Sequence, residues 1–363
     1  MTNREREILN IIKDNPLISQ EEMASMLGIT RSSVAVHITN LMKKGLIKGK
    51  GYILSDEDEY VVAIGGANID LLGFPKGKLN LRDSNPGRMK ISIGGVARNI
   101  AENLVRLGVN TKLLTLVGDD LYGKKIIEHS KKIGLDMSLS KVLDISQTST
   151  YLSIQDDKGD MAVALSCMDI YDDFKVDYIK ENEGMIKKSK CIVLDTNIPE
   201  EIIKYIIENF NIPVFLDTVS TNKAMKVKNF IGKFYCIKPN KYEAEVLSGI
   251  KIESENDLKR AAEYFLNRGV KKVFITLGED GIYYGDESRL NLFKTPKVEV
   301  KNATGAGDAF VAGLVFAYLN DFDIHSTAKF STAASVLALL SEDTINQNMS
   351  IENINYIIKE MGL

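Results

Sequence analysis

Cysteine is scarce in this sequence. Cys167, Cys191 and Cys236 are the only three in 363 residues, and each lies in or beside an apolar run. A framework of disulfide bonds is therefore excluded as the means of holding the fold, and the thiols are interpreted as small buried apolar groups. This usage predicts a reducing compartment, the cytoplasm.

Long apolar runs are missing as well. No stretch reaches the about eighteen uninterrupted apolar residues that a membrane-spanning helix needs. The N-terminus shows a polar pattern with helix-capping residues and no hydrophobic signal core. We therefore expect neither export nor an association with membranes.

Neither sign of charge dominates the chain, which has 46 Lys and Arg against 49 Asp and Glu and a formal net charge of −3. This balance excludes a protein that coats nucleic acid along its whole length. Hydrophobic residues at 44% and charged residues at 26% are typical of globular proteins. A chain of 363 residues is best read as two folded units.

The charge is unevenly distributed. Residues 1–55 contain eight basic and five acidic side chains, a balance of +3, which leaves −6 for the rest of a chain whose total is −3. The change falls at an acidic run without apolar residues, just before a strand-like segment that begins at Tyr60. The sequence therefore predicts one domain over residues 1–55, a linker over 56–59 and a second domain over 60–363.

The first 55 residues have the pattern of three short helices and a hairpin. Thr2 with Glu5, and Ser19 with Glu22, have the spacing of capping boxes and predict two helix starts. A third helix is predicted over residues 31–42, and residues 46–54 alternate around glycines as a two-stranded wing would. The apolar side of this third helix would be formed by Val34, Ile38, Leu41 and Met42. Its outer side would be formed by Arg31, Ser32, Ser33, His37 and Asn40.

This segment resembles the winged helix-turn-helix domains of bacterial transcription regulators. The resemblance implies that the third helix enters the major groove of double-stranded DNA through its outer side. The phosphate contacts would come from Lys43, Lys44, Lys48 and Lys50. The alternative is a small helical domain used for dimer contacts or for binding a protein partner.

From Tyr60 onward, short β-rich runs alternate with amphipathic helical segments, which predicts an α/β fold with a mostly parallel sheet covered by helices. The runs are 61–64, 113–117, 191–194, 214–216, 234–237 and 273–276. Two segments, 88–93 and 149–165, alternate like exposed antiparallel strands and predict a small projecting sheet. Such a sheet suits a lid over a site, and its free edges predict a homodimer.

The most informative stretch is the glycine-rich turn at residues 302–313, which leads into an apolar helix. Gly305 and Gly307 allow backbone amides to approach an anion, and the helix N-terminus adds unpaired N–H donors. Asp308 has two interpretations: a base that takes a proton from an attacking hydroxyl, or a helix cap. Residue spacing alone leaves both open.

The turn is similar to the C-terminal signature of the ribokinase-like PfkB family of sugar and nucleoside kinases. Residues 94–108, 117–123, 238–247 and 276–281 resemble further motifs of that family, in the same order. The resemblance implies a ribokinase-like fold and phosphoryl transfer from ATP. The turn at Gly65, Gly66 and Ala67 lacks the glycine spacing of a dinucleotide-binding fold, which argues against a dehydrogenase.

The family pattern also implies roles for particular residues. Asp308 would be the catalytic base, and the amides of Gly305, Ala306 and Gly307 would stabilise charge on the transferred phosphoryl group. Asn240 and Glu243 would organise Mg²⁺, largely through water. The ATP site would comprise Asp217, Asn240, Thr276, Gly278, Gly281, Gly305 and Gly307.

The substrate site would lie at the strand ends near the predicted lid. Residues 65–70, 83–87, 95–99 and 150–152 most resemble pseudouridine kinases, some of which carry a winged-helix extension, and imply phosphorylation of the nucleoside 5′-hydroxyl. Arg98 is interpreted as a contact to the transferring phosphate or as a helix-surface residue. The substrate contacts would be Asn68, Asp70, Gly94, Gly95, Asn99 and Asn197, with Ser84 and Asn85 on the base.

Two residues depart from the family pattern. Asn302 stands where many members have an aspartate that helps to hold a monovalent cation, so activation by K⁺ stays open. Cys167 stands where pseudouridine kinases often have an acid. The alternatives are a kinase of ribose, another nucleoside or a sugar acid, and a transcription regulator whose kinase-like domain only senses a ligand.

Overall fold

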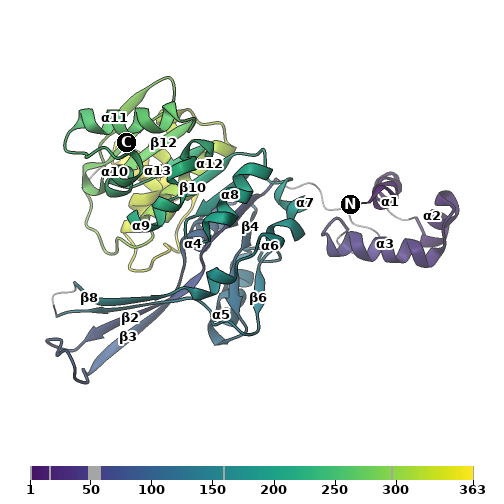
Figure 1. The fold of residues 1–363 in the computed structure, drawn as a ribbon, viewed down its shortest axis with the longest axis horizontal. Helices are drawn as coiled ribbons and strands as arrows, with labels where there is room; N and C mark the ends of the chain where they lie inside the picture. The colour runs from purple at the N-terminus through teal and green to yellow at the C-terminus, as the bar shows by residue number, and fades with distance from the viewer. Residues whose placement is uncertain (1, 16–17, 48–58, 158–159, 296, 363) are drawn as a thin grey trace. The chain divides into compact units, whose positions relative to one another are not determined.

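The computed structural model describes residues 2–15, 18–47, 59–157, 160–295 and 297–362. The chain separates into two compact units, Met1–Glu59 and Tyr60–Leu363, coloured along the chain in Figure 1. Within the described residues, no helix is long and apolar enough to cross a membrane. Each unit is described by itself below.

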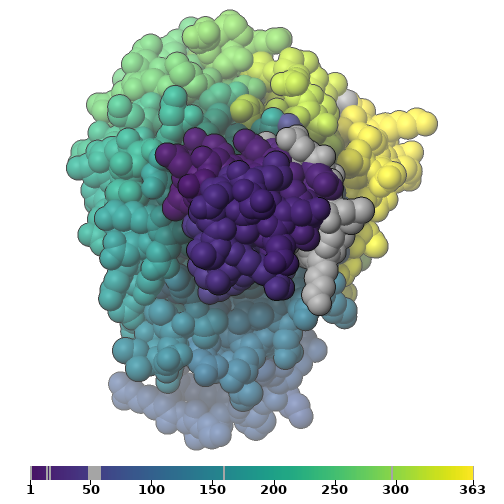
Figure 2. Space-filling view, turned by 90° about the vertical axis from the view of Figure 1, so that its right-hand side faces the viewer, coloured from purple at the N-terminus to yellow at the C-terminus, as the bar shows by residue number. Residues whose placement is uncertain are grey.

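The N-terminal unit contains three helices, α1 (Asn3–Asp14), α2 (Gln20–Leu27) and α3 (Arg31–Lys43). Both predicted capping boxes form, because the hydroxyls of Thr2 and Ser19 accept the amides of Glu5 and Glu22, whose carboxylates accept in return. The helices pack around an apolar core that includes Ile8. Figure 2 shows this unit in purple as a compact body.

Two predictions about this unit need comment. Met42 was expected in the core, but 45% of it is exposed, because the buried side of α3 consists of Val34, Ile38 and Leu41. The predicted wing, apart from residues 46 and 47, lies outside the described residues, as do Lys48, Lys50 and residues 56–58 of the predicted linker.

The large unit is built on a mostly parallel sheet in the order β14-β13-β12-β11-β10-β9-β1-β4. Strand β13 runs antiparallel to both of its neighbours, β12 and β14, and the other neighbouring strands are parallel. The central strands are rich in β-branched and aromatic residues, and their side chains are buried on both faces, as a sheet covered on two sides requires. The strands are β1 (Val61–Ile64), β4 (Thr111–Leu114), β9 (Cys191–Asp195), β10 (Val214–Asp217), β11 (Cys236–Lys238), β12 (Lys272–Thr276), β13 (Ile282–Gly285) and β14 (Leu290–Phe293).

Helices cover both faces of this sheet, which confirms the predicted ribokinase-like α/β architecture (Figure 1). Side chains alternate along each strand, so Val62 packs in one apolar cluster and Val61 in the other. The first cluster includes residues of α6 (Val176–Glu181), α7 (Glu183–Ile186), α8 (Glu200–Asn209), α9 (Thr221–Ala224), α10 (Lys241–Ser248) and α11 (Glu255–Asn267). The second includes α4 (Val96–Arg106), α12 (Ala306–Leu319), α13 (Ile324–Leu339) and α14 (Ile351–Glu360).

A second sheet projects from the body of the large unit (Figure 1). Its order is β3-β2-β7-β8, with β2 (Asn68–Pro75), β3 (Gly87–Gly94), β7 (Thr150–Gln155) and β8 (Met161–Cys167). We call these four strands the lid. The predicted lid strands are present, but β2 was not foreseen. A two-stranded sheet of β5 (Leu116–Gly118) and β6 (Lys141–Leu143) lies beside α5 (Leu121–Ile133).

Candidate active site

The carboxyl ends of the parallel strands place several polar residues along one edge of the sheet. Asp195 ends β9, Asp217 ends β10 and Lys238 ends β11, and Asp195 and Asp217 are register partners. In a parallel sheet the strand ends form a crevice where ligands bind. All three side chains are nevertheless buried, and we call them the floor of the candidate site.

Asp308 faces this floor from the first turn of α12. Gly305 stands at the helix cap, and the Asp308 carboxylate accepts a 2.8 Å hydrogen bond from Nδ2 of Asn99 on α4. Lys238 pairs with Asp217 at 3.1 Å, and its charge also acts on Asp308. Burial, helped by the nearby Asp217 charge, raises the pKa of Asp308 to about 7. A carboxyl group with this pKa can accept a proton near neutral pH.

The glycine turn before α12 is shaped by close backbone packing. Gly305 has φ +86°, and a Cβ atom there would lie 2.1 Å from the carbonyl oxygen of Thr344. Only glycine fits this position without moving the turn. The first amides of α12 have no acceptor further back in the helix. The Ala306 amide makes a long bond of 3.4 Å to the Ala303 carbonyl in the turn, and the Gly307 amide follows it, so the turn can offer N–H donors to an anion beside Asp308.

Asn240 and Glu243 are tied to each other at the start of α10. Glu243 Oε2 accepts from the Asn240 amide at 2.8 Å and from the Thr218 hydroxyl at 2.6 Å, while Oε1 accepts from Asn240 Nδ2 at 2.8 Å. Glu243 is 3% exposed. With its carboxylate so engaged, it suits a hydrated Mg²⁺ ion held through water better than a directly bonded one.

Oxygen atoms of Asn240 and Glu243 are of the kind that magnesium takes through water, and the surrounding charges favour a cation. The carboxylates of Asp217, Glu243 and Asp308 all act on the single charge of Lys238, whose pKa they raise although burial acts to lower it. This leaves an excess of negative charge that a hard cation can balance. Among the described residues, no group of three His, Cys, Asp or Glu side chains is already arranged around one metal position.

The predicted nucleotide turn follows β12. Thr276 donates its amide to Pro239 at 3.0 Å, and the Leu277 amide reaches Gly281 at 2.8 Å. Gly278 and Gly281 have φ values of +64° and +102°, and a Cβ at Gly281 would lie 2.1 Å from the Phe293 oxygen. These glycines are therefore required by the turn itself, and their contact with ATP stays a prediction.

In the lid, Asn68 and Asp70 lie on β2. Asn68 Nδ2 donates to Asp70 Oδ1 at 2.6 Å. Burial raises the pKa of Asp70. A Cβ at Gly94 would lie 2.2 Å from Asp70 Oδ2, and one at Gly95, where φ is +98°, would lie 2.4 Å from the Cα of Ala67. The two glycines thus allow β3 and α4 to approach β2.

Asp195 was missed by the sequence reasoning. Its Oδ2 accepts the amides of Gly66 and Ala97, and its Oδ1 accepts the amide of Asn197, each at 2.8 Å. One buried carboxylate therefore fixes the turns after β1 and β9 and the start of α4. The available signal was the position of Asp195 at the end of an apolar strand.

Lys223 was also missed. This residue of α9 donates to Oδ1 of Asn197 at 2.5 Å and to the sulfur of Met168 at 3.4 Å. Burial lowers the pKa of its ammonium group. The buried Asn197 and the partly exposed Lys223 thus form an acceptor and donor pair near the end of β9.

The two predicted base contacts lie in the loop between β2 and β3. Ser84 is exposed, and the Asn85 amide donates to the carbonyls of Asn80 and Asp83 at 2.8 and 3.0 Å. Asn85 therefore shapes this loop. The structure does not bring either residue into contact with the crevice floor, and their role stays a prediction.

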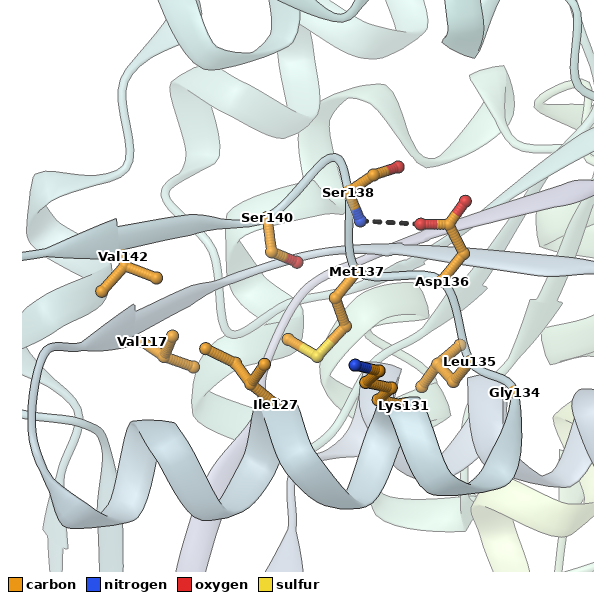
Figure 3. Close-up of a pocket in the computed structure, with 10 residues that line it drawn as sticks. All are labelled: Val117, Ile127, Lys131, Gly134, Leu135, Asp136, Met137, Ser138, Ser140 and Val142. Carbon is orange, nitrogen blue, oxygen red and sulfur yellow. Dashed lines mark hydrogen bonds between the residues drawn. The ribbon is translucent and has the colours of Figure 1, made fainter. Parts of the chain in front are cut away.

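A hollow of about 480 Å³ lies elsewhere, between α5 and the small β5–β6 sheet (Figure 3). Val117, Ile127 and Met137 are among its largely apolar lining, and Asp136 at its rim accepts the Ser138 amide at 2.8 Å. None of the predicted site residues lines it. The cluster around Asp308 is thus the better candidate for the chemistry.

Comparison with known protein families identifies the class of protein to which this fold and site belong. Residues 58–351 match the model of the pfkB family of carbohydrate kinases, and residues 1–48 match that of winged helix-turn-helix DNA-binding domains. The chain belongs to the PfkB family and carries an N-terminal winged helix-turn-helix domain. Members of this family are ATP-dependent sugar and nucleoside kinases.

Three particular relatives are informative. The pseudouridine kinase of Escherichia coli is 38% identical over 305 residues, covering 84% of this chain and 97% of that protein. An uncharacterized sugar kinase of E. coli, YeiI, is 35% identical over 355 residues, covering 97% of this chain and 98% of that protein. The crystal structure of a putative sugar kinase from Clostridium perfringens has a TM-score of 0.75 and 40% identity, covering 85% of this chain and 96% of that one.

Proposed function

We propose that this chain is a pseudouridine kinase that transfers the γ-phosphoryl group of ATP to the 5′-hydroxyl of pseudouridine. The observation that carries the reaction type is the buried Asp308 carboxylate, poised with a pKa of about 7 beside a glycine turn that presents amides to an anion. The choice of substrate is supported by the 38% identity to a pseudouridine kinase.

In the proposed reaction, Asp308 accepts the proton of the 5′-hydroxyl as that oxygen attacks the γ-phosphorus and the bond to the ADP oxygen breaks. The amides of Gly305, Ala306 and Gly307 donate to the transferred group, where a single donor commonly contributes about 3 kcal/mol. Lys238, which is paired with Asp217, places a positive charge close to Gly307 in the same turn. Mg²⁺, held through water by Asn240 and Glu243, would neutralise phosphate charge.

The ribose and the base need different partners. Asn68 and Asp70 offer an amide and a carboxylate to neighbouring hydroxyls, and a carboxylate can accept from two at once. Asn197 and Lys223 lie near the end of β9, where they offer donors and an acceptor to a polar group. Each polar group of a uracil ring that was buried without such a partner would cost about 1–3 kcal/mol.

A substrate panel tests this function. Purified protein with Mg²⁺ and ATP is given pseudouridine, uridine, ribose, fructose or inosine, in KCl and in NaCl, and ADP is measured. We expect turnover of pseudouridine at least a hundredfold above the others, a ratio of about 2.7 kcal/mol in transition-state binding. A preference for ribose, fructose or another nucleoside would contradict the choice of pseudouridine as the substrate, and ligand binding without turnover would favour a ligand-sensing regulator.

The two salts address K⁺. Asn302 carries no charge, and its amide is already used: Oδ1 accepts the Thr304 amide at 2.9 Å and Nδ2 donates to the Glu342 carbonyl at 3.2 Å. The Asn302 side chain thus joins the glycine turn before α12 to the loop after α13 through its own hydrogen bonds, where a carboxylate would instead favour a cation. We propose that turnover does not require K⁺, so the KCl and NaCl rates should agree within about twofold.

A second function, DNA binding, is favoured by the surface of α3. Of the residues predicted on the outer side, Arg31 and Ser32 are exposed, while Ser33, His37 and Asn40 are partly buried. The exposed residues of α3 also include Val36, Thr39 and Lys43, of which Val36 and Thr39 were not foreseen. Lys44 instead pairs with the buried Glu5 at 2.8 Å, within the unit itself.

Salt-dependent binding tests this proposal. The full chain should bind a 30-bp duplex, and the affinity should fall steeply between 50 and 200 mM salt. Proteins that make about six to ten phosphate contacts lose affinity in this way because binding releases counterions from the DNA. Arg31→Ala with Lys43→Glu should weaken binding about tenfold or more. Lys204→Glu, the same charge reversal on an exposed lysine of the kinase unit, is the control. Equal binding by all three proteins would contradict a role for α3.

We also propose a homodimer formed through the lid. The strand β8 is exposed along its whole length, including Met161, Val163 and Leu165, and β3 exposes Met89 and Ile91. Open edges and apolar side chains of this kind are usually covered in the working protein. Light scattering should give twice the 40.3 kDa of one chain, and a monomer at micromolar concentration would contradict this assembly. We also propose the cytoplasm as the location, in line with three free thiols, of which Cys191 and Cys236 are buried and Cys167 is exposed, contrary to the prediction.

A further inference from the structure

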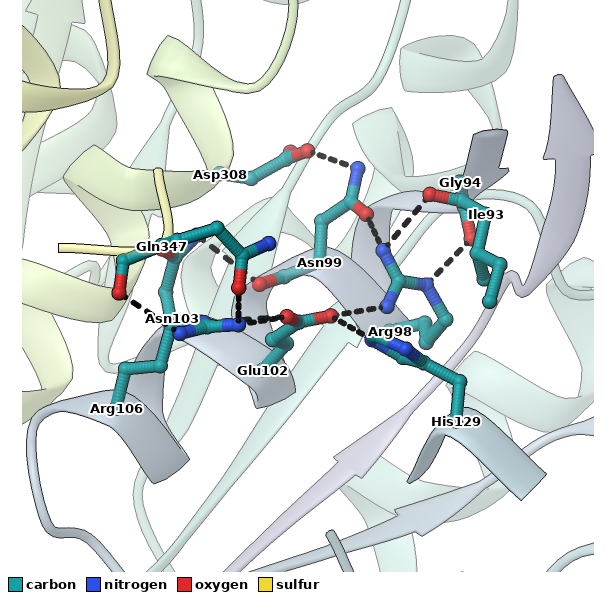
Figure 4. Close-up of polar contacts among 10 residues, drawn as sticks. All are labelled: Ile93, Gly94, Arg98, Asn99, Glu102, Asn103, Arg106, His129, Asp308 and Gln347. Atoms are coloured by element: carbon teal, nitrogen blue, oxygen red, sulfur yellow. Dashed lines mark hydrogen bonds and ion pairs between the residues drawn. The ribbon is translucent and has the colours of Figure 1, made fainter. Parts of the chain in front are cut away.

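Arg98 is neither a surface residue nor free to contact a phosphate. It lies on α4 with 1% of its side chain exposed, and each of its three guanidinium nitrogens donates to a protein group (Figure 4). Nε donates to the Gly94 carbonyl at 2.8 Å and Nη2 to the Ile93 carbonyl at 3.1 Å, both at the end of lid strand β3. Nη1 pairs with Glu102 at 2.6 Å.

The remaining contact of Arg98 is with Asn99, whose Oδ1 also accepts from Nη2. A guanidinium group can only donate, so the oxygen end of the Asn99 amide must face it. The nitrogen end is then turned towards Asp308, to which it donates at 2.8 Å. Arg98 therefore decides which end of this amide meets the carboxylate.

We propose that Arg98 is a positioning residue for the reaction: it fixes the Asn99 amide so that a donor faces the Asp308 carboxylate, and it anchors that arrangement to the end of the lid strand β3. This inference rests on the proposed role of Asp308 as the base. Arg98 itself touches neither substrate nor the reacting atoms.

The consequence is a bias on the proton equilibrium of Asp308. The charged groups facing Asp308 are Asp217 on β10, Lys238 on β11 and Asp195 on β9. The hydrogen bond from Asn99 opposes the effects of burial and of the two carboxylates, because it favours the ionised form. Without Arg98 the amide can turn over and present its oxygen, which favours the protonated form instead.

Glu102 keeps Arg98 in place. It pairs with Arg98, with Arg106 at 2.8 Å and with His129 at 3.0 Å (Figure 4). Burial acts to raise the pKa of Glu102, but the charge of Arg98 and the other contacts lower it to about 2. Removing Arg98 alone would leave a buried anion, so the test removes both charges together.

The experiment measures kcat/KM for the substrate with the highest turnover between pH 5.5 and 9. For the wild-type protein we expect activity to rise with pH through an apparent pKa near 7, because the base must be ionised. In Arg98→Met with Glu102→Gln, this pKa should move up by about one unit, giving roughly a tenfold loss at pH 6 that shrinks below about twofold at pH 9. Arg98→Lys, which keeps the buried charge but lacks the planar fork, should shift in the same direction.

Two controls separate this effect from a general disturbance. Arg106→Met removes another Glu102 partner on the same helix without touching Asn99, and should leave the pH profile unchanged. His129→Gln removes the imidazole that contacts Glu102, again without touching Asn99. This variant should also keep the wild-type profile.

The outcomes are distinct. A shift confined to the Arg98 variants supports the inference. An unmoved profile in a folded Arg98 variant, or an equal shift in both controls, overturns it while the proposed kinase function stands. A wild-type protein without turnover of any substrate overturns the proposed function and this inference together.

Discussion

Asp308→Asn should reduce kcat roughly a thousandfold, within the range that a general base usually contributes. Asparagine has the same shape and can still accept the Asn99 hydrogen bond, but it cannot take a proton. The loss should appear in kcat at saturating ATP and nucleoside, because the substitution removes a step of the reaction and leaves binding largely intact. Steady-state ADP formation measures it.

The fold should survive this substitution. Burial raises the pKa of Asp308 to about 7 in the folded protein, against about 3.9 for an unfolded chain. The folded state therefore favours the protonated form, and the stability it gains at low pH is lost as pH rises through 7. At pH 8 the variant should melt no lower than the wild type.

Asp321→Asn is the matched control. It is the same exchange at the exposed far end of α12, where φ is +54°, a conformation that asparagine tolerates. It should keep wild-type turnover. A kcat for Asp308→Asn within tenfold of the wild type would remove Asp308 as the base.

Gly305→Ala should reduce kcat roughly a hundredfold, the effect of losing or misplacing one donor of an anion site. The new methyl group would lie 2.1 Å from the Thr344 oxygen, so the turn must shift and move its amides away from the transferred group. Binding of ATP should weaken as well, which isothermal titration with a non-hydrolysable analogue would show.

Gly108→Ala provides the comparison. Gly108 has φ +79°, close to the +86° of Gly305, but a Cβ there meets nothing within 4 Å. Both variants therefore incur the same backbone strain, about 1 kcal/mol of stability, and only Gly305→Ala disturbs the turn. Equal kcat values for the two would show that the turn does not serve the reaction.

The sequence predicted the elements whose signals are local. Capping boxes marked the starts of α1 and α2, and short apolar runs between helical segments located β1, β9 and β10. The lid was recognised from the alternation of exposed strands. The family resemblance then supplied roles that residue spacing alone had left open, above all for Asp308.

What the sequence could not predict depends on contacts between distant segments. Asp195 reaches Gly66 across 129 residues, and Asn99 reaches Asp308 across 209. Lys223 gave no local signal, since a lysine in a short helix usually faces solvent.

Arg98 shows how such a rule fails. Residues 97–104 of α4 are all buried, because the helix lies between the sheet and α12, so its polar residues had to pair with one another. An argument from amphipathic pattern places an arginine outside such a helix. The network around Glu102 is visible only once the helices are packed.

The most direct test of this account is the identity of the product. Wild-type protein is incubated with ATP, Mg²⁺ and pseudouridine, and the phosphorus and proton NMR spectra of the product are recorded. We predict one phosphate ester, coupled to the two C5′ protons and formed in equal amount to ADP. ADP without a phosphorylated nucleoside, or a phosphate on another hydroxyl, would contradict the proposed reaction.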